Sequence, residues 1–322
     1  MAYLFLRTAS QAKNNTQFSS TLIASVKLRV IMENKFHVRS NSFPSGSHPC
    51  ISKLEDELSK LKTWEATSTS TSNYIVTGLS LLQDLHISLE DLLNLPSTQK
   101  VISNHQGEKC MEELLDGSVR ILDVCGITRD TMLQIKENVE ALHSALRRRK
   151  GDSSIERIIA EYNLFSKKMK KNVKKLITSL KQMESKFAVS PLLNQDQQLA
   201  VLVRVLREVI VMNMSIFRSL LAFLVIPASK PKATKWLLMA KLMIKGVITC
   251  EENQEKSNEL QCVEASLSNL LRSEGTNIAK MQAAHHRLEA LENATQSIEN
   301  RLESIFRHMV KTRAHLLNMM TQ

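Results

Sequence analysis

The residue types that most often perform catalysis or bind metals are scattered along this chain. Nine histidines and five cysteines are present, but they form no HExxH motif and no CxxC pair. Adjacent His285 and His286 would point about 100° apart on a helix, and His308 and His315 would lie about two turns apart. Neither spacing brings two ligands onto one metal ion without further groups from elsewhere in the fold. We therefore expect no metal site and no bound cofactor.

The spacing of the glycines argues against nucleotide-dependent chemistry. Loops that cradle a phosphate need closely spaced glycines, because backbone N–H groups must approach the anion. The chain has eight glycines, and the two closest, Gly117 and Gly126, are nine positions apart. This spacing excludes P-loops, dinucleotide-binding fingerprints, kinase glycine loops and nucleophile elbows. The sequence therefore predicts a protein that is not an enzyme.

One short motif has the chemistry of a regulated binding site. Arg39, Ser40, Ser42 and Pro44 match the pattern R-S-x-S-x-P, which 14-3-3-type adaptors bind when the second serine is phosphorylated. Phosphorylation would add roughly two negative charges and three acceptor oxygens, which an arginine-lined groove on the adaptor can bind. We predict phosphorylation at Ser42 followed by adaptor binding, with an unmodified polar tail as the alternative.

A basic helix face is the second candidate site. Between Arg147 and Phe187 the sequence holds 13 Lys or Arg and 4 Asp or Glu, a local charge of +9, whereas the whole chain carries +11. Apolar residues recur here every three or four positions, which predicts one helix over 155–187 with lysines opposite the apolar side. Such a face attracts phosphate, acidic proteins or an anionic membrane surface, although a merely solvated face is the alternative. The lysines predicted to bind anions are Lys167, Lys168, Lys170, Lys171, Lys174 and Lys175.

The elements that must position these residues are helical. The chain has only 8 Gly and 6 Pro in 322 residues, and aromatic residues make up 4%, whereas strands and tight hairpins use these residues heavily. Helical periodicity predicts segments over 75–93, 108–149, 155–187, 199–226 and 260–270. We therefore expect an all-α fold, an elongated antiparallel bundle of long amphipathic helices.

The segment 199–226 is apolar on nearly every side, so other helices or lipid must cover it. In the window Leu199–Arg218, three arginines and a glutamate would each cost roughly 2.5–3.5 kcal/mol near the middle of a bilayer, and each apolar side chain returns only about 0.3–0.6 kcal/mol. The later window, 209–226, contains a single arginine and is closer to balance. We predict a buried core helix, with membrane insertion of 209–226 as the alternative.

The C-terminal segment has a seven-residue repeat. Ten of twelve repeat positions are apolar, which favours coiled-coil-like packing. A partner of similar length exists in segment 108–149, so a bundle within one chain is favoured over a dimeric coiled coil. The repeat positions are Met281, Ala284, Leu288, Leu291, Thr295, Ile298, Leu302, Ile305, Met309, Thr312, Leu316 and Met319.

The N-terminal part has a different composition. Residues 1–31 are basic, rich in serine and threonine and free of acidic residues, which is typical of an organellar presequence; an upstream extension of the protein is the other interpretation. Residues 32–72 are polar and end in the run TSTSTS, so they predict a disordered tail with a short helix over 51–64. The expected bundle domain is 73–322, with linkers near 96–107 and 227–235.

Several passages, taken together and in this order, resemble a known family. They are FHVRSNSFPSGSHP at 36–49, the TSTSTS run, GLSLLQDLH at 78–86, LLDGSVRILDVCGITRD at 114–130 and ALRRRKG at 145–151. They resemble the plant BYPASS-related family, whose members carry a domain of unknown function. The resemblance implies a plant-specific, helix-rich protein linked to root and shoot development, with no catalytic residues to transfer. Some members of that family are described as membrane-associated or plastid-directed.

These observations predict a non-enzymatic helical scaffold or adaptor protein of plants with a phosphoserine-regulated tail. The five scattered cysteines argue for reduced thiols and an intracellular, most simply cytoplasmic, protein. The alternative is a peripheral or single-span membrane protein that uses the basic helix 155–187 and the apolar helix 209–226. Nucleic acid is disfavoured as a partner, because no aromatic residues interleave with the lysines. No small-molecule substrate is expected.

Overall fold

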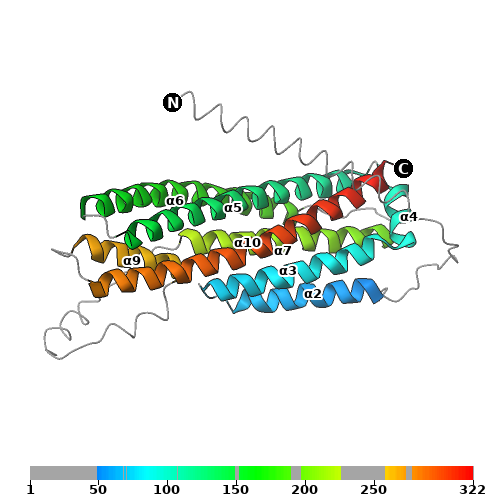
Figure 1. The fold of residues 1–322 in the computed structure, drawn as a ribbon. Helices are drawn as coiled ribbons and strands as arrows, with labels where there is room; N and C mark the ends of the chain where they lie inside the picture. Colours follow the sequence, from blue (N-terminus) through cyan, green and yellow to red (C-terminus); the bar gives the residue numbers. More distant parts are fainter. Residues whose placement is uncertain are drawn as a thin grey trace, which may run out of the picture.

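The structure of the chain is a computed structural model, and it describes residues 49–67, 69, 71–106, 108–148, 152–189, 197–225, 258–272 and 278–321. These residues form eight α-helices and no strand (Figure 1), so the all-α fold class is confirmed. The helices are α2 (Pro49–Ala66), α3 (Ser72–Leu93), α4 (Pro96–Asn104), α5 (Lys109–Arg147), α6 (Asp152–Val189), α7 (Gln197–Val225), α9 (Glu259–Leu271) and α10 (Ile278–Met320).

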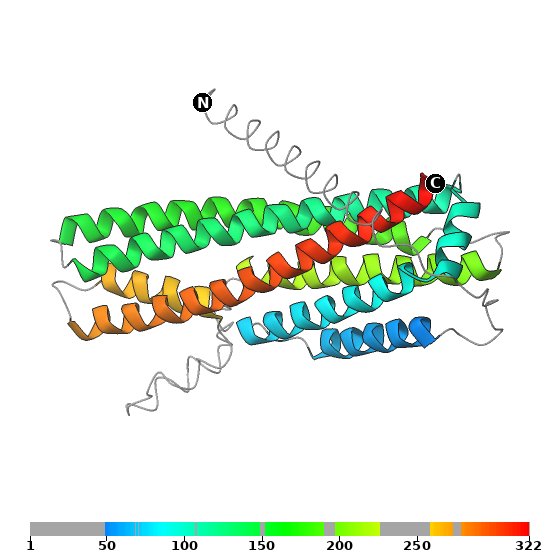
Figure 2. The same cartoon turned by 45° about the vertical axis from the view of Figure 1, so that its right-hand side comes forward.

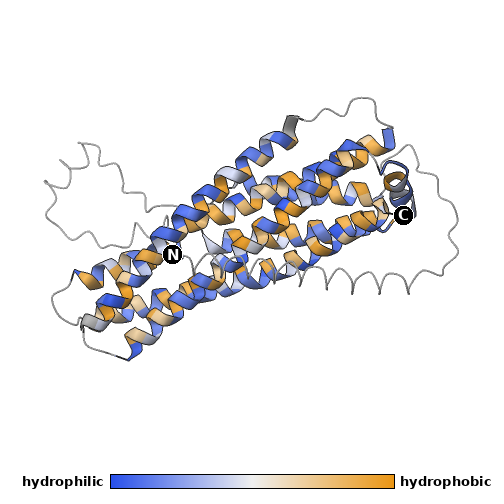
Figure 3. Cartoon of the chain, turned by 90° about the horizontal axis from the view of Figure 1, so that it is seen from above, coloured by the Kyte–Doolittle hydropathy of each residue, from blue (hydrophilic) through white to orange (hydrophobic). Residues whose placement is uncertain are grey.

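The bundle is elongated, as predicted. Helices α5, α6 and α10 contain 39, 38 and 43 residues and run along the body of the molecule (Figure 2), so each is about 60 Å long at 1.5 Å per residue. Helices α5 and α10 are antiparallel neighbours, because His143 near the end of α5 contacts Glu292 in the first half of α10. At the other end, Arg313 near the end of α10 donates to the carbonyl of Leu115 near the start of α5. Seen from above, apolar and hydrophilic segments alternate along each long helix (Figure 3), which is the pattern of amphipathic helices.

Helix α7 is the centre of the bundle and contacts α2, α3, α4, α5 and α6. Eighteen of its 29 residues are buried. Its charged residues reach partners on neighbouring helices: Arg204 binds Glu55 at 2.8 Å, and Arg218 binds both Glu65 and Glu184. Among the described residues, α7 is also the one helix long and apolar enough to cross a membrane, and 72% of its most apolar window is buried by the rest of the protein.

The seven-residue repeat of α10 faces the inside of the bundle. Eleven of its twelve positions are buried, and the exception, Met281, is half-buried. Helix α10 packs against α3, α5 and α9 of the same chain. The polar repeat residue Thr295 donates its hydroxyl to the Leu291 carbonyl at 2.9 Å, which satisfies its hydrogen-bonding capacity inside the core. The repeat therefore packs within one chain, as the sequence favoured.

The second half of the predicted tail belongs to the bundle. Leu54, Leu58 and Leu61 of α2 are at most 1% exposed and pack in a helix that contacts α3 and α7. The short helix predicted over 51–64 is present, but the disorder predicted for 32–72 is wrong over this stretch. The segment is polar on average, and its single leucine stripe is nevertheless sufficient to hold it on the core.

The predicted linker near 96–107 is also mostly helical. Pro96 follows the end of α3 and occupies the first position of α4. At that position a helix makes no hydrogen bond with its backbone N–H, so proline, which lacks one, loses nothing. Val101 and Ile102 are buried, and Ser103 donates to the Met319 carbonyl at 3.0 Å. A proline that predicts the end of one helix therefore also begins the next.

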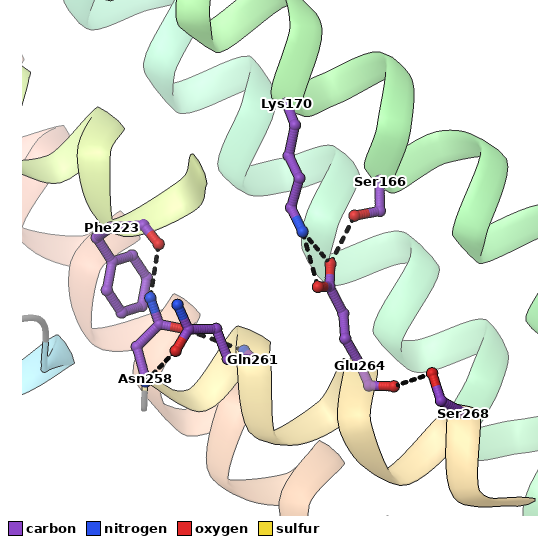
Figure 4. Close-up of polar contacts among 7 residues, drawn as sticks. All are labelled: Ser166, Lys170, Phe223, Asn258, Gln261, Glu264 and Ser268. Carbon is purple, nitrogen blue, oxygen red and sulfur yellow. Dashed lines mark hydrogen bonds and ion pairs between the residues drawn. The ribbon is translucent and has the colours of Figure 1, made fainter. Parts of the chain in front are cut away.

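Helix α9 begins beside the end of α7. Asn258 caps α9 in a reciprocal capping box with Gln261, which satisfies two otherwise unpaired N–H groups. The side chain of Asn258 also donates to the Phe223 carbonyl at 2.7 Å (Figure 4). One buried side chain therefore joins helix ends that are 35 positions apart in the sequence. The helix predicted over 260–270 is confirmed as α9.

Three other predictions lie outside the described residues. They are the presequence-like or extension segment 1–31, the unstructured part of the tail over 32–48, and the linker near 227–235.

Gly78 allows α2 to lie close to α3. A Cβ atom at this position would lie 2.3 Å from a ring carbon of Trp64. That ring is held in place, because it stacks on Tyr74 at 4.2 Å between ring centroids and its Nε1 donates to the Tyr74 carbonyl at 3.0 Å. The close approach of the two helices therefore depends on the absence of a side chain at Gly78.

Gly78→Ala should destabilise the protein by about 2 kcal/mol, because overpacking a well-ordered core costs roughly 1–3 kcal/mol. Gly126→Ala is the matched control: no atom lies within 4 Å of its added Cβ. That substitution should stabilise the protein by up to about 1 kcal/mol, since alanine is the better helix former. Urea denaturation of both variants measures the difference. Equal stabilisation by the two substitutions would contradict the packing described for Trp64.

Candidate functional site

The basic face predicted from the sequence lies on α6. The apolar side of this helix, including Tyr162, Val173 and Leu180, is buried in the bundle, where α6 contacts α5 and α7. Burial, with a smaller contribution from Glu264, raises the pKa of Tyr162, so its hydroxyl stays neutral. The opposite side of the helix faces solvent. We define the lysine face as the five exposed residues Lys167, Lys168, Lys171, Lys174 and Lys175.

Lys170, the sixth lysine of the prediction, has a different environment. Its Nζ lies 2.6 and 2.7 Å from the two carboxylate oxygens of Glu264 on α9, and Ser166 donates to the same carboxylate at 2.7 Å (Figure 4). The Lys170 side chain is only 26% exposed. Lys170 therefore fastens α9 to α6 and is not one of the solvent-facing lysines.

The lysine face is not neutralised within the described part of the chain, where none of its five residues forms an ion pair. The nearby α6 carboxylates have other partners: Glu161 lies 3.6 Å from Arg157, and Glu184 binds Arg218 on α7. Leu164, one turn before the first lysine, is 68% exposed. The surface thus combines several unpaired positive charges with one exposed apolar side chain.

The neighbouring helix α5 carries charges of the opposite sign. It packs against α6 and exposes an acidic residue every seventh position: Asp116, Asp123, Asp130 and Glu137. The charges of Asp116 and Asp123 in this stripe act on Arg313 of α10. The lysine face itself is confined to α6.

A buried polar pair, which the sequence did not point to, joins α3 to α7. His86 and Asn213 are each 3% exposed, and His86 Nε2 lies 3.1 Å from Asn213 Oδ1. Asn213 Nδ2 donates to the Val209 carbonyl at 2.8 Å, so Oδ1 is the acceptor and His86 carries its hydrogen on Nε2. Burial lowers the pKa of His86 to about 4, although the bond with Asn213 and the charge of Glu90 act against this shift. His86 is therefore a neutral core histidine.

The other predicted candidates do not come together as a site. Arg39, Ser40, Ser42 and Pro44 lie outside the described residues. Within the described part of the chain, no group of three or more His, Cys, Asp or Glu side chains is arranged to hold a metal ion. Of the histidine clusters, His285 packs against a histidine of α5 at 5.1 Å between ring centroids.

A comparison with protein-family models gives one match. The model described as Protein BPS1 matches residues 78–319, about three quarters of the chain. The chain belongs to the BPS1 family. The match begins within α3, so α2, which packs on the bundle in this structure, lies before the part matched by the BPS1 model. No match was found among curated proteins or among solved structures.

The buried His86 should make this BPS1-family protein sensitive to acid. Its pKa is 6.5 in the unfolded chain and about 4 in the folded one, so the unfolded state binds a proton first as the pH falls. Stability should therefore fall by about 3 kcal/mol between roughly pH 6.5 and 4, at about 1.4 kcal/mol per unit of pKa difference. Denaturant unfolding at several pH values measures this slope.

His86→Gln should flatten the pH dependence of stability, because glutamine can still pair with Asn213 and does not titrate. His286→Gln, on the exposed side of α10, is the control and should retain the wild-type slope. A wild-type slope in the His86 variant would show that other groups cause the acid sensitivity.

Proposed function

We propose that this BPS1-family chain is a non-enzymatic scaffold or adaptor that acts in plant development by binding other proteins. Membership of the family supports the developmental role. The observation that carries the binding role is the lysine face, whose five exposed lysines have no ion pair within the described residues. An acidic segment of a partner protein would supply the missing charges.

The packing that holds the backbone of the lysine face in place supports this role. Helix α6 is packed against α5 and α7 along its apolar side, and Lys170 ties it to Glu264 of α9. A partner would therefore meet lysines whose backbone is already ordered, so that less entropy is lost on binding. Charged residues at the edge of an interface mainly increase the association rate and set its salt dependence.

The partner predicted from this surface is an acidic protein segment with one apolar residue. Leu164, Lys168, Lys171 and Lys175 follow each other at intervals of three and four residues, so they lie along one side of α6. Exposed Leu164 would give such a partner an apolar anchor beside the charges. Affinity in protein interfaces comes largely from a few anchors of this kind.

Membrane attachment is the second candidate function, and the apolar window of α7 together with the basic α6 favours it. Insertion of α7 would require it to leave its contacts with five other helices. Peripheral docking through the lysine face would require no such change and would use the same attraction between lysines and negative charge as an acidic protein segment. We take a protein partner as the main proposal because exposed Leu164 beside the lysines suits an apolar anchor, and vesicle binding tests the alternative.

A second proposed binding element is the phosphorylated segment around Ser42. Ser42 precedes Pro49, the first residue of α2, by only seven positions. An adaptor of the 14-3-3 type bound there would be held close to α2 and the core. Pull-down of that adaptor with phosphorylated full-length protein tests this element: Ser42→Ala should abolish recovery, and Ser45→Ala should not.

Reversing three lysines of the lysine face tests the main proposal. Lys171→Glu/Lys174→Glu/Lys175→Glu should weaken binding to a fluorescent polyglutamate peptide at least tenfold, because three attractive charges become repulsive. Wild-type binding should also weaken as salt is added. Fluorescence anisotropy at two salt concentrations measures both effects. Lys170 is left unchanged, since its loss would free α9.

The matched control changes the net charge equally at exposed positions elsewhere: Lys100→Glu/Lys109→Glu/Arg272→Glu. It should bind the peptide within about twofold of wild type. Equal losses in both triple variants would mean that only net charge matters, and no lysine face would be needed. Binding to phosphatidylserine vesicles without binding to the peptide would favour the membrane function instead.

A further inference from the structure

The middle of the bundle contains a small cavity. It has a volume of about 40 Å³ and is lined by residues of α3, α5, α7 and α10. One water molecule needs roughly 10–15 Å³ of such space, so the cavity has room for about three water-sized groups. Its wall is mainly apolar and includes Leu114, Leu206 and Leu316. His86 and Thr312 are two of its few polar residues.

Two residues of this wall each have a buried polar atom with no hydrogen-bond partner. These atoms are Nδ1 of His86 and Oγ1 of Thr312. His86 is 3% exposed and Thr312 is 7% exposed. The hydroxyl of Thr295, in the same helix, donates to the Leu291 carbonyl, whereas Thr312 forms no such bond. Unpaired buried polar atoms are rare in folded proteins, because they lose their hydrogen bonds to water without replacement.

The unused hydrogen-bonding capacity defines what fits the cavity. Since Nε2 of His86 carries the hydrogen, Nδ1 can only accept, and the hydroxyl of Thr312 can donate or accept. The other polar wall residues are engaged: Asn213 binds His86 and the Val209 carbonyl, and Ser118 binds the Leu115 carbonyl. The wall carries no charged side chain, so a charged guest would lose its hydration without compensation.

We propose that this cavity is a binding site for a small neutral molecule with one hydroxyl group and an apolar body. The hydroxyl donates to His86 Nδ1 and accepts from Thr312 Oγ1, and the carbon atoms lie against the leucines of the wall. This site is separate from the lysine face and does not depend on the function proposed for it.

Two isomeric probes test the proposal on the full-length protein. Ethanol and dimethyl ether are isomers with three non-hydrogen atoms, which matches the room in the cavity, but only the alcohol can donate a hydrogen bond. In protein with ¹⁵N-labelled histidines, ethanol should cause a saturable change in the chemical shift of His86 Nδ1, assigned by comparison with His86→Gln. The ether should bind at least tenfold more weakly.

Thr312→Val removes the unpaired hydroxyl with almost no change in shape. It should lower the affinity for ethanol at least fivefold while leaving the protein as stable as before or more so. Thr295→Val, the same substitution at another buried position of α10 outside the cavity wall, should bind ethanol like wild type. An unchanged His86 resonance would mean that the cavity holds water alone. Equal binding of the two probes, or of the two variants, would also overturn the proposal.

Discussion

Helix α7 must bury most of its surface against neighbouring helices, because exposing apolar area to water costs about 25 cal/mol per Å². Eighteen of its 29 residues are buried. Five other helices cover it. Its arginines can enter this environment only where carboxylates meet them, since a buried charge without a partner costs several kcal/mol. Glu113 of α5 and Glu184 of α6 supply such partners for Arg207 and Arg218, and Glu55 of α2 pairs with the exposed Arg204. The positions of α2, α5 and α6 are thereby tied both to apolar contact and to a specific ion pair.

The two candidate binding features follow from this arrangement. Helix α6 uses its apolar side to cover α7, so its lysines are left on the outer surface with an ordered backbone. Helices α3 and α5 also cover α7, and residues of these three helices and of α10 line a cavity. Two residues of its wall have an atom without a hydrogen-bond partner, Nδ1 of His86 and Oγ1 of Thr312. One feature offers charge to a macromolecule at the surface, and the other offers hydrogen bonds to a small molecule in the core.

Periodicity in the sequence predicted the helical class, the long helices and the packing of α10 within the chain. It succeeded there because apolar side chains at intervals of three and four residues have only one way to be buried. It predicted the helix over 51–64 but placed it in a disordered tail outside the bundle, and it missed α4, whose Val101 and Ile102 were outweighed by polar neighbours and by Pro96. Lys170 was assigned to the lysine face because sequence alone does not reveal Glu264 opposite it. His86 was missed for the same reason, since Asn213, 127 positions away, is what makes its environment polar.

Amide hydrogen exchange of the purified full-length protein in detergent-free buffer is the most direct test of the central claim that α7 is covered by its own chain. Amides exchange most slowly where only global unfolding exposes them. The account predicts that the amides from Leu202 to Leu221 exchange at the rate of global unfolding and more slowly than those of α6 near Lys171. Fast exchange along α7, or a protein that stays dispersed only in detergent, would contradict it.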